Sequence, residues 1–435
     1  MRKRALTEPL RIPLFRRLSL TYAINEMGDW MGIIALSVLV YDQTESAMAT
    51  AALFLGTRFL PALLAPLVAT QAERPAPRVA LPVMYCGEAA AFGALALFAV
   101  NFSLPVVIAL AAVDGALALA TRALTRTMVA TMLEPIGLLR QGNAILNVAF
   151  TGGAAIGPAL AGLVVAGLGV PTALLLDAVS FYAIAWIIFT AGPLPQTEPE
   201  PGRLRERVRA GVTYIRGQVT LRNLLIAQGA AFVFFSAVIP VEVVYAKETL
   251  GASDSGYGLM LASWGVGMVI GSLVFAGVNR FSLAILLGVS TLAVAAGYLG
   301  LAAAPTLALA CAASVVGGAG NGVQWVSAIS AVQELTAAEM QARVMSVLES
   351  VGAAMPGAGF VLGGVVATWM DPRATFLLAG VGILAIVALA APALARNWPE
   401  RAATPGSERL DGADDVVLEL LPRGSYVHSD REVQR

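Results

Sequence analysis

The stretch PLPQTEPEPGRLRERVRAGVTYIRGQVTLRN, residues 193–223, decides the fold because it divides two long apolar halves of the chain. Its first nine residues hold four prolines, which disfavour a continuous helix. Apolar residues then recur at helical spacing: Leu204, Val208, Val212, Ile215 and Val219. With arginines on the other faces, this pattern predicts an amphipathic helix on the inner surface of a membrane. A solvated linker is the alternative interpretation.

The composition of the two halves is that of a membrane protein. Of the 435 residues, 58% are hydrophobic and 13% are charged, whereas a soluble globular domain carries about 25% charged residues. A bilayer core of about 30 Å needs about 20 apolar residues per helix, and twelve runs meet this requirement. They lie near residues 19–41, 46–70, 79–100, 105–132, 143–168, 170–191, 222–246, 255–278, 282–303, 305–334, 343–369 and 373–395.

Six runs on each side of the central stretch predict an all-α membrane protein with twelve transmembrane helices in two six-helix bundles. Residues of the two halves also match at an offset of 200: Gln141, Gly152, Ala154, Gly157 and Val165 recur as Gln341, Gly352, Ala354, Gly357 and Val365. The expected divisions are a cytoplasmic N-terminal tail (1–18), an N-terminal bundle (19–191), a cytoplasmic linker with the amphipathic helix (192–221), a C-terminal bundle (222–396) and a cytoplasmic tail (397–435).

The distribution of basic residues predicts the orientation. If both termini are cytoplasmic, 23 of the 28 lysines and arginines fall in cytoplasmic segments, and only Lys247 and Arg373 fall in outer loops. Because basic residues accumulate on the cytoplasmic side, we expect a multi-pass protein of the plasma (cytoplasmic) membrane with both termini inside. The first apolar run is followed by further spans and not by a small-residue cleavage site, which argues against a cleaved signal peptide.

Residue usage argues against several chemistries. His428, the only histidine, lies in the polar C-terminal tail, which argues against a histidine metal site in the core. Neither Lys3 nor Lys247 ends a G-x-x-x-x-G-K-[ST] motif, so the chain has no Walker A loop for ATP. Cys86 and Cys311 lie in apolar runs and are expected to pack as small hydrophobic residues. We expect no enzyme activity, metal, cofactor or nucleic-acid partner, and a monomer.

Short motifs occur in a specific order within residues 15–395: Gly28-Asp29-Trp30, Tyr41-Asp42-Gln43-Thr44, Glu73-Arg74-x-x-x-Arg78, Gly153-x-x-x-Gly157-Pro158, Ala210-Gly211-x-x-Tyr214 and Arg343-Val344-Met345-Ser346. With these motifs the chain resembles the major facilitator superfamily, and within it the drug:proton antiporter branch that includes enterobactin-type exporters. The resemblance implies a secondary transporter that moves small amphipathic, drug-like or siderophore-like molecules outward by alternating access. A proton gradient would drive this efflux, with drug resistance as the expected phenotype.

The resemblance also implies a gating loop after the second span, with Glu73, Arg74 and Arg78. In this chain Ala69 replaces the family's glycine and Glu73 replaces its aspartate, so the loop departs from the family's pattern at two positions.

The fifth span carries the other conformational element. Small residues at Gly153 and Gly157 allow a neighbouring helix to approach closely, and Pro158 bends the span by removing one backbone hydrogen bond. In antiporter relatives this element lies at the interface of the two bundles and limits leak. A close helix crossing is expected in either case.

Acidic residues inside the spans are candidates for proton coupling, because a carboxylate at the bilayer centre costs about 2.5–3.5 kcal/mol. Asp29 lies near the middle of the first span, and Glu26 lies one turn closer to the cytoplasm, near the mouth. In the functional interpretation, Asp29 gains and loses a proton as the cavity changes sides. In the structural interpretation, Asp29 forms a fixed ion pair with Arg58 of the second span.

Asp114 and Arg122 on the fourth span form a second candidate set, because the resemblance places this helix at the cavity. Arg122 would tune proton release there, or would extend to the inner headgroups, which is the stronger expectation for Arg126. Of the remaining acids, Asp177 is expected to act as a structural cap near the outer end of the sixth span. Glu88 has no partner that the sequence identifies.

Four aromatic residues fall on helices expected at or near the substrate cavity: Trp30, Phe150, Phe235 and Trp325. They would contact a bulky amphipathic small molecule, or pack against neighbouring helices or membrane lipid. Two competing functions are a lipid or lysophospholipid flippase and a non-transporting membrane receptor or scaffold. Buried titratable acids favour transport, because a scaffold has no reason to retain their insertion cost.

The charge distribution makes a direct prediction for topology. In a variant without Cys86 and Cys311, we expect Gln43→Cys and a cysteine in the 247–254 loop to react with an impermeant thiol reagent added to intact cells. A cysteine in the 203–222 linker should react only after permeabilisation. The reverse labelling pattern would invert the orientation.

Overall fold

The computed structural model describes residues 7–63, 77–191, 194, 204–277 and 281–398. All regular secondary structure in this part of the chain is helical. Eleven of its helices are long and apolar enough to cross a membrane. The expected span 46–70 corresponds to a shorter apolar helix, Ala47–Leu63, beyond which lie undescribed residues. The all-α membrane fold is therefore confirmed, and the boundaries of the tails and linker stay predictions.

The first bundle contains α1 (Pro13–Thr44), α2 (Ala47–Phe54), α4 (Pro77–Val100), α5 (Leu104–Leu133), α6 (Leu139–Leu168) and α7 (Val170–Phe189). A π-helical turn, Leu55–Phe59, continues α2, and a 3₁₀ turn, Glu8–Arg11, precedes α1. This bundle holds the intramembrane acids Asp29 and Asp114.

The second bundle begins with α9 (Val219–Val238), which continues through Ile239–Val241, α10 (Glu242–Val244) and a π-helical turn, Tyr245–Thr249. It is completed by α11 (Asp254–Gly277), α12 (Leu283–Ala303), α13 (Leu307–Glu334), α14 (Gln341–Trp369) and α15 (Pro372–Asn397). A 3₁₀ turn, Ala338–Met340, separates α13 from α14.

Several helices are longer than their apolar runs. The first apolar run begins near residue 19, but α1 begins at Pro13 and includes Arg16 and Arg17. A proline in the first turn favours helix initiation because its missing N–H needs no partner there. At 1.5 Å per residue, the 32 residues of α1 span about 48 Å, more than the roughly 30 Å hydrocarbon core. Hydropathy therefore locates the membrane-embedded part of the helix but underestimates the length of the whole helix.

The two bundles meet through small residues on α6 and α11. A Cβ atom added to Gly162 of α6 would lie 3.0 Å from the Cα atom of Gly258 on α11. Ala154 on α6 similarly packs directly against Gly265 on α11. Because the residues in contact at these points are glycine and alanine, the two backbones can approach closely inside the membrane.

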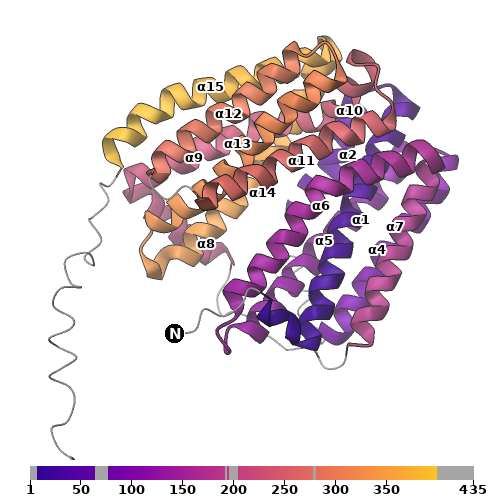
Figure 1. The fold of residues 1–435 in the computed structure, drawn as a ribbon, viewed down its shortest axis with the longest axis horizontal. Coiled ribbons are helices and arrows are strands. Elements are labelled where there is room, and N and C mark those ends of the chain that lie inside the picture. The colour runs from indigo at the N-terminus through magenta and orange to yellow at the C-terminus, as the bar shows by residue number, and fades with distance from the viewer. Residues whose placement is uncertain (1–6, 64–76, 192–193, 195–203, 278–280, 399–435) are drawn as a thin grey trace, which may run out of the picture.

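A second crossing joins α2 to α14. A Cβ atom at Gly364 would lie 2.8 Å from the Ala51 Cβ atom, and the rings of Phe54 and Phe360 are 5.7 Å apart. The helices α6 and α14 carry the residues that match at an offset of 200, so equivalent helices form the two crossings. In Figure 1 the ribbons of the two bundles lie together near α2 and α10 and apart near α8.

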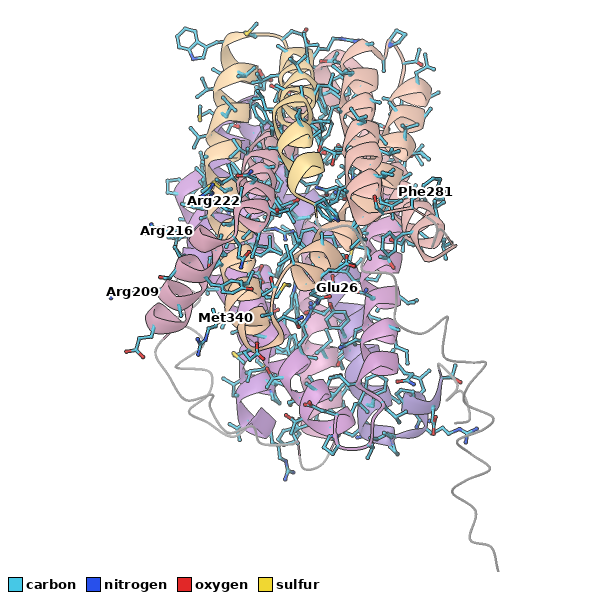
Figure 2. The ribbon with its side chains drawn as sticks, turned by 90° about the vertical axis from the view of Figure 1, so that its left-hand side faces the viewer. Glu26, Arg209, Arg216, Arg222, Phe281 and Met340 are labelled. Atoms are coloured by element: carbon cyan, nitrogen blue, oxygen red, sulfur yellow. The ribbon has the colours of Figure 1, made fainter. Side chains whose placement is uncertain are left out.

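The linker helix α8 (Leu204–Gly217) has the predicted helical structure and packs on the second bundle. A Cβ atom at its Gly211 would lie 2.6 Å from the Arg343 carbonyl oxygen of α14. The backbone N–H of Ala337 donates a hydrogen bond of 3.2 Å to the Tyr214 hydroxyl. Figure 2 shows Arg209 and Arg216 along this helix, where both side chains are exposed. Its place on the inner membrane surface stays a prediction.

Because α6 and α11 cross so closely, a large side chain at the crossing should lower the stability of the protein, whereas the same side chain elsewhere on α6 should not. Gly162→Leu should destabilise the protein by about 1–3 kcal/mol, the usual cost of overpacking, measured as a lower Tm in detergent. Gly167→Leu is the matched control on α6, because a Cβ atom there meets nothing within 4 Å. Equal Tm values for the two variants would contradict the role of this crossing.

Candidate functional site

An ion pair inside the first bundle joins α1 to α5. The Nη2 atom of Arg122 donates to the Oδ2 atom of Asp29, and the Nδ2 atom of Asn25 donates to the same oxygen at 3.2 Å. The side chains are 28% exposed for Arg122 and 15% for Asp29, so both charges are largely removed from solvent. A partly buried carboxylate is stabilised by a cation and a hydrogen-bond donor.

This ion pair faces a cavity of about 120 Å³. Four charged residues line it, Asp29, Asp114, Arg58 and Arg122, together with apolar side chains that include Phe92. The Oδ1 atom of Asp114 is buried and has no hydrogen-bond partner in the described part of the chain. Two acids and two arginines therefore share one small cavity, which lies between α1, α4, α5 and the helical segment that continues α2 through Leu55–Phe59.

A glycine explains how α2 and α5 bring these groups together. A Cβ atom at Gly115 would lie 2.9 Å from the Pro61 side chain and would also collide with the Thr57 carbonyl group. The close approach places Asp114, which precedes Gly115, beside Arg58, which follows Thr57. Arg58 lies in the π-helical turn Leu55–Phe59, and such turns occur frequently at functional sites.

The charge partner of Asp29 differs from the structural interpretation of the sequence, which paired it with Arg58. Arg122 forms the ion pair, and Arg58 lines the same cavity. Both arginines lie near mid-span in the sequence, but sequence depth does not specify which helix packs beside which. Arg122 is consequently oriented into the bundle and does not extend to the headgroups.

Glu26 is not at the mouth of a cavity. It is 2% exposed, and its Oε1 atom has no hydrogen-bond partner among the described residues. A Cβ atom at Gly153 of α6 would lie 3.2 Å from the Glu26 Cβ atom, so Glu26 is enclosed at the α1–α6 crossing. Figure 2 shows its side chain among the helices of the first bundle.

Two further acids, Asp177 and Glu88, are more deeply buried than the sequence indicated. Asp177 is fully buried within α7, eight residues into a 20-residue helix, and is not a terminal cap. A Cβ atom at Gly32 would lie 2.7 Å from its Oδ2 atom, and its Oδ1 atom accepts from the Ser180 hydroxyl at 3.2 Å. The Gly28-x-x-x-Gly32 spacing is the signal that could have indicated this close approach.

Glu88 on α4 is also fully buried. The Thr121 hydroxyl donates to its Oε1 atom at 3.1 Å, and Thr121 is the neighbour of Arg122 on α5. Among the described residues, no group of three or more His, Cys, Asp or Glu side chains is placed to hold a metal ion. The buried acids are therefore arranged beside arginines and hydroxyls.

The fifth-span element contacts both bundles. A Cβ atom at Gly157 would lie 2.8 Å from the Trp30 Cβ atom on α1, so this glycine accommodates a tryptophan of its own bundle. The carbonyl oxygen of Pro158 packs against Gly258 on α11 of the other bundle. Arg78 is exposed at the start of α4, whereas Glu73 and Arg74 lie outside the described residues. Roles in gating and leak stay predictions.

The candidate cavity aromatics have different surroundings. Phe235 packs inside the second bundle, 6.1 Å from Trp264 and 6.3 Å from Tyr298 between ring centroids. Trp325 is 46% exposed, with its ring 6.2 Å from that of Phe232. Trp30 and Phe150 are half-buried on α1 and α6. Of these side chains, Trp325 offers the largest accessible ring to a substrate.

A polar network joins the two bundles at the end away from α8. The Tyr41 hydroxyl donates to the Oε1 atom of Glu248 at 2.5 Å. Lys247 pairs with Asp42 on α1 at 2.5 Å and with Asp254 on α11 at 2.8 Å. Lys247 was expected in an outer loop, and Tyr41 and Asp42 belong to a short sequence motif. Neither feature of the sequence predicts that these residues hold the bundles together.

Comparisons with known proteins agree with this architecture. A family model described as transmembrane secretion effector, MFS_3, matches residues 5–419. Among solved structures, a POT family transporter in complex with 5-aminolevulinic acid is 12% identical, with a TM-score of 0.72 over 88% of this chain and 96% of the other. A mutant form of the nucleoside transporter NupG is 12% identical, with a TM-score of 0.69 over 87% and 99%.

A third solved structure is a bacterial homolog of the human lysosomal transporter Spinster in an inward-facing, unoccupied conformation. It is 13% identical, with a TM-score of 0.68 over 91% of this chain and 100% of the other. No curated protein matches the chain in sequence. The structural similarity at this level of identity establishes the fold.

The Asp29–Arg122 pair predicts a specific mutant cycle. Asp29→Asn and Arg122→Gln should each lower stability, because each leaves a partly buried charge unpaired, by an amount between the roughly 1 kcal/mol of exposed pairs and the 3–5 kcal/mol of buried ones. The double variant should recover most of the loss. Combining Asp29→Asn with Arg58→Gln should recover less, and equal recovery would contradict the assigned pairing. The Tm values of the wild type, the two single variants and the two double variants, measured by thermal unfolding in detergent, test this prediction.

Proposed function

The chain belongs to the transmembrane secretion effector family of the major facilitator superfamily, and we propose that this secondary transporter exports small amphipathic molecules in exchange for protons. The observation that carries the proposal is the pairing of Asp29 with Arg122 beside a second acid, Asp114, in one cavity of the first bundle. The family's description, which names secretion, supports the outward direction.

Protonation of Asp29 would act as a switch between two ion pairs. Adding a proton to the Asp29 carboxylate removes its charge, which breaks its attraction to Arg122. Arg122 then shares the cavity with Asp114, whose Oδ1 atom has no hydrogen-bond partner among the described residues. The Arg122 guanidinium would then move away from Asp29 on α1 and toward Asp114, which lies on the same helix α5 as Arg122. This movement would loosen the contact between α1 and α5. Loss of the proton would restore the original pair.

Alternating access would follow from the contacts between the bundles. The described bundles are held together by Tyr41–Glu248 and Lys247–Asp42 at the end away from α8. With the expected topology this end is the outer one, so the described conformation faces inward. Opening to the outside requires these polar contacts to break, while the small-residue crossings permit the bundles to rock.

The substrate would bind between the bundles, near the accessible ring of Trp325 and the half-buried Phe150. Aromatic faces bind flat, amphipathic molecules. The solved structures of similar fold are described as transporters of nucleosides and as a POT family transporter bound to 5-aminolevulinic acid. Since one fold carries such different cargo, the bundle architecture by itself selects no substrate.

The test is transport into everted membrane vesicles. We expect Asp29→Asn to bind substrate but to lose uphill, proton-driven accumulation, because an amide keeps the size of the side chain and cannot carry the proton. A substrate screen that follows internal pH with a fluorescent dye identifies the cargo first. Fluorescent lysophospholipid in the same vesicles tests the competing flippase activity.

Two controls complete the test. Glu134→Gln changes an exposed carboxylate at the end of α5 and should leave uphill transport unchanged. Asp29→Glu keeps a titratable group and should retain part of the coupling. Full uphill transport by a stable Asp29→Asn protein would exclude Asp29 as the coupling residue and make Asp114 the next candidate.

A further inference from the structure

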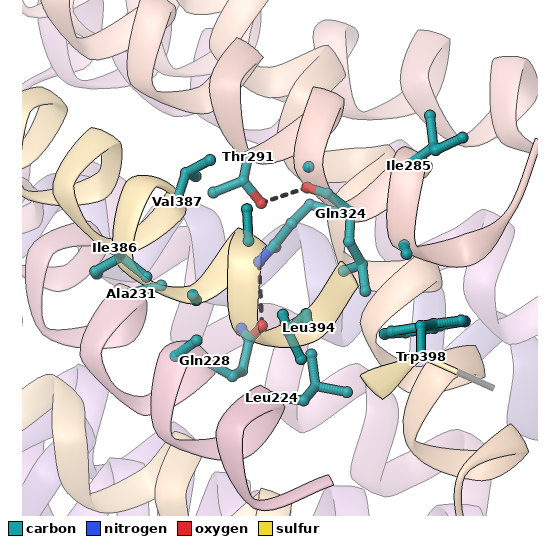
Figure 3. Close-up of a pocket in the computed structure, with 16 residues that line it drawn as sticks. Leu224, Gln228, Ala231, Ile285, Thr291, Gln324, Ile386, Val387, Leu394 and Trp398 are labelled. Carbon is teal, nitrogen blue, oxygen red and sulfur yellow. Dashed lines mark hydrogen bonds between the residues drawn. The ribbon is translucent and has the colours of Figure 1, made fainter. Parts of the chain in front are cut away.

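A second cavity lies inside the second bundle, away from the acids of the first. It has a volume of about 220 Å³ and lies between α9, α12, α13 and α15. Figure 3 shows its walls, with Leu224 and Ala231 on α9, Ile285 and Thr291 on α12, and Trp398 just beyond α15. None of its lining residues belongs to the charged cavity at Asp29.

The few polar groups of this cavity are bonded to protein. The Nε2 atom of Gln324 donates to the Oε1 atom of Gln228 at 3.2 Å, and both side chains are buried. The Thr291 hydroxyl donates to the Leu287 carbonyl oxygen at 2.6 Å. The other lining residues are aliphatic, glycine or tryptophan. The cavity therefore favours an apolar guest, because an apolar surface gains dispersion contacts and offers water no partners.

The shape of the cavity follows the helix axes. Its lining runs from Leu224 to Ala231 on α9 and from Ala284 to Thr291 on α12, a separation of seven residues in each case. At 1.5 Å per residue this is about 10 Å along each helix. Both segments begin within about six residues of the start of their helices. The cavity thus extends from one membrane face into a single leaflet, whose hydrocarbon half-thickness is about 15 Å.

Exposed apolar side chains beside the cavity indicate what kind of molecule binds there. Lining residue Ile285 is 52% exposed, and Val289, one turn further along α12, is 62% exposed. In a membrane-spanning bundle such side chains face hydrocarbon. Ile285 belongs both to the cavity lining and to this exposed surface, so a membrane lipid can reach the cavity there. Its volume is below the roughly 300–1,000 Å³ of sites for drug-sized ligands, and its narrow, elongated shape fits a segment of one acyl chain.

We propose that this cavity, lined by α9, α12, α13 and α15, binds the acyl chain of a membrane lipid. The chain would lie parallel to the helices and pack against Leu224, Ile285 and Val387. Trp398 lies at the end of the cavity near the membrane face, where an indole ring can contact both chain and headgroup region. This site is separate from the proposed transport cavity and stands independently of the proton coupling.

One glycine provides a selective test. Gly288 lines the cavity, and a Cβ atom added to it meets no atom within 4 Å. Gly288→Leu therefore directs an apolar side chain into the cavity from a position where its Cβ atom has space. Gly93→Leu on α4 is the matched control, because its Cβ atom also meets nothing within 4 Å and it lies outside the cavity.

The experiment uses the full chain in nanodiscs that contain a phospholipid with a diazirine in one acyl chain. After illumination, mass spectrometry should find adducts concentrated on peptides that contain residues 284–291 and 386–398. Gly288→Leu should reduce these adducts at least about fivefold, because leucine takes the apolar surface that the chain would bury. Gly93→Leu should leave them unchanged.

Three results would overturn the proposal. The first is labelling spread evenly over all lipid-facing helices, which would indicate only surrounding lipid. The second is unchanged labelling of the cavity peptides in Gly288→Leu at normal expression and Tm. The third is suppression of cavity labelling by a soluble transported molecule at concentrations that saturate transport, which would assign the cavity to cargo. A variant that lacks proton-driven transport but keeps the labelling pattern would leave the lipid site standing.

Discussion

The hydrocarbon core of a lipid bilayer supplies no hydrogen-bond partners, and this constraint shapes the membrane-spanning part of the molecule. Backbone groups must be satisfied within each segment, which explains why the described spans are helices. The same constraint acts on side chains. Asp29 is paired with Arg122 and Asn25, and Gln324 is bonded to Gln228. Because Arg122 lies on a different helix from Asp29, and Gln324 on a different helix from Gln228, these two polar pairs fix which helices neighbour one another.

Small residues provide the second organising principle, since apolar burial does not drive helices together within lipid. Gly162 and Gly258 allow the bundles to touch, and Gly115 brings α5 against α2. The two bundles touch at close helix crossings of small residues and through polar contacts at one end. The Asp29–Arg122 ion pair, in contrast, lies within the first bundle. In the proposed mechanism, this separation would allow the bundles to move against each other while the charged cavity gains or loses a proton. Charge and movement are then linked through α1, which carries both Asp29 and Tyr41.

The sequence located much of the candidate site but not its pairings. Asp29, Asp114, Arg58 and Arg122 were all identified because charged residues in apolar runs are costly, and the structure places them around one cavity. The choice of Arg122 over Arg58 depends on helix neighbours and rotation, which depth in the membrane does not specify. Glu26 and Asp177 were misplaced for the same reason: each is enclosed by a glycine on an adjacent helix. The polar network at Lys247 joins residues about 200 positions apart.

By itself, the sequence determined that the chain is an all-helical, multi-pass membrane protein, and it predicted twelve spans divided near residue 200. It could do so because the length and composition of an apolar run are local properties that decide whether a segment enters a bilayer. It also determined which residues could carry charge inside the membrane. The tertiary structure decided which charges pair, which glycines form crossings and where cavities remain. Those outcomes depend on the rotation and proximity of helices distant in sequence, and close packing fixes both only when the whole bundle assembles.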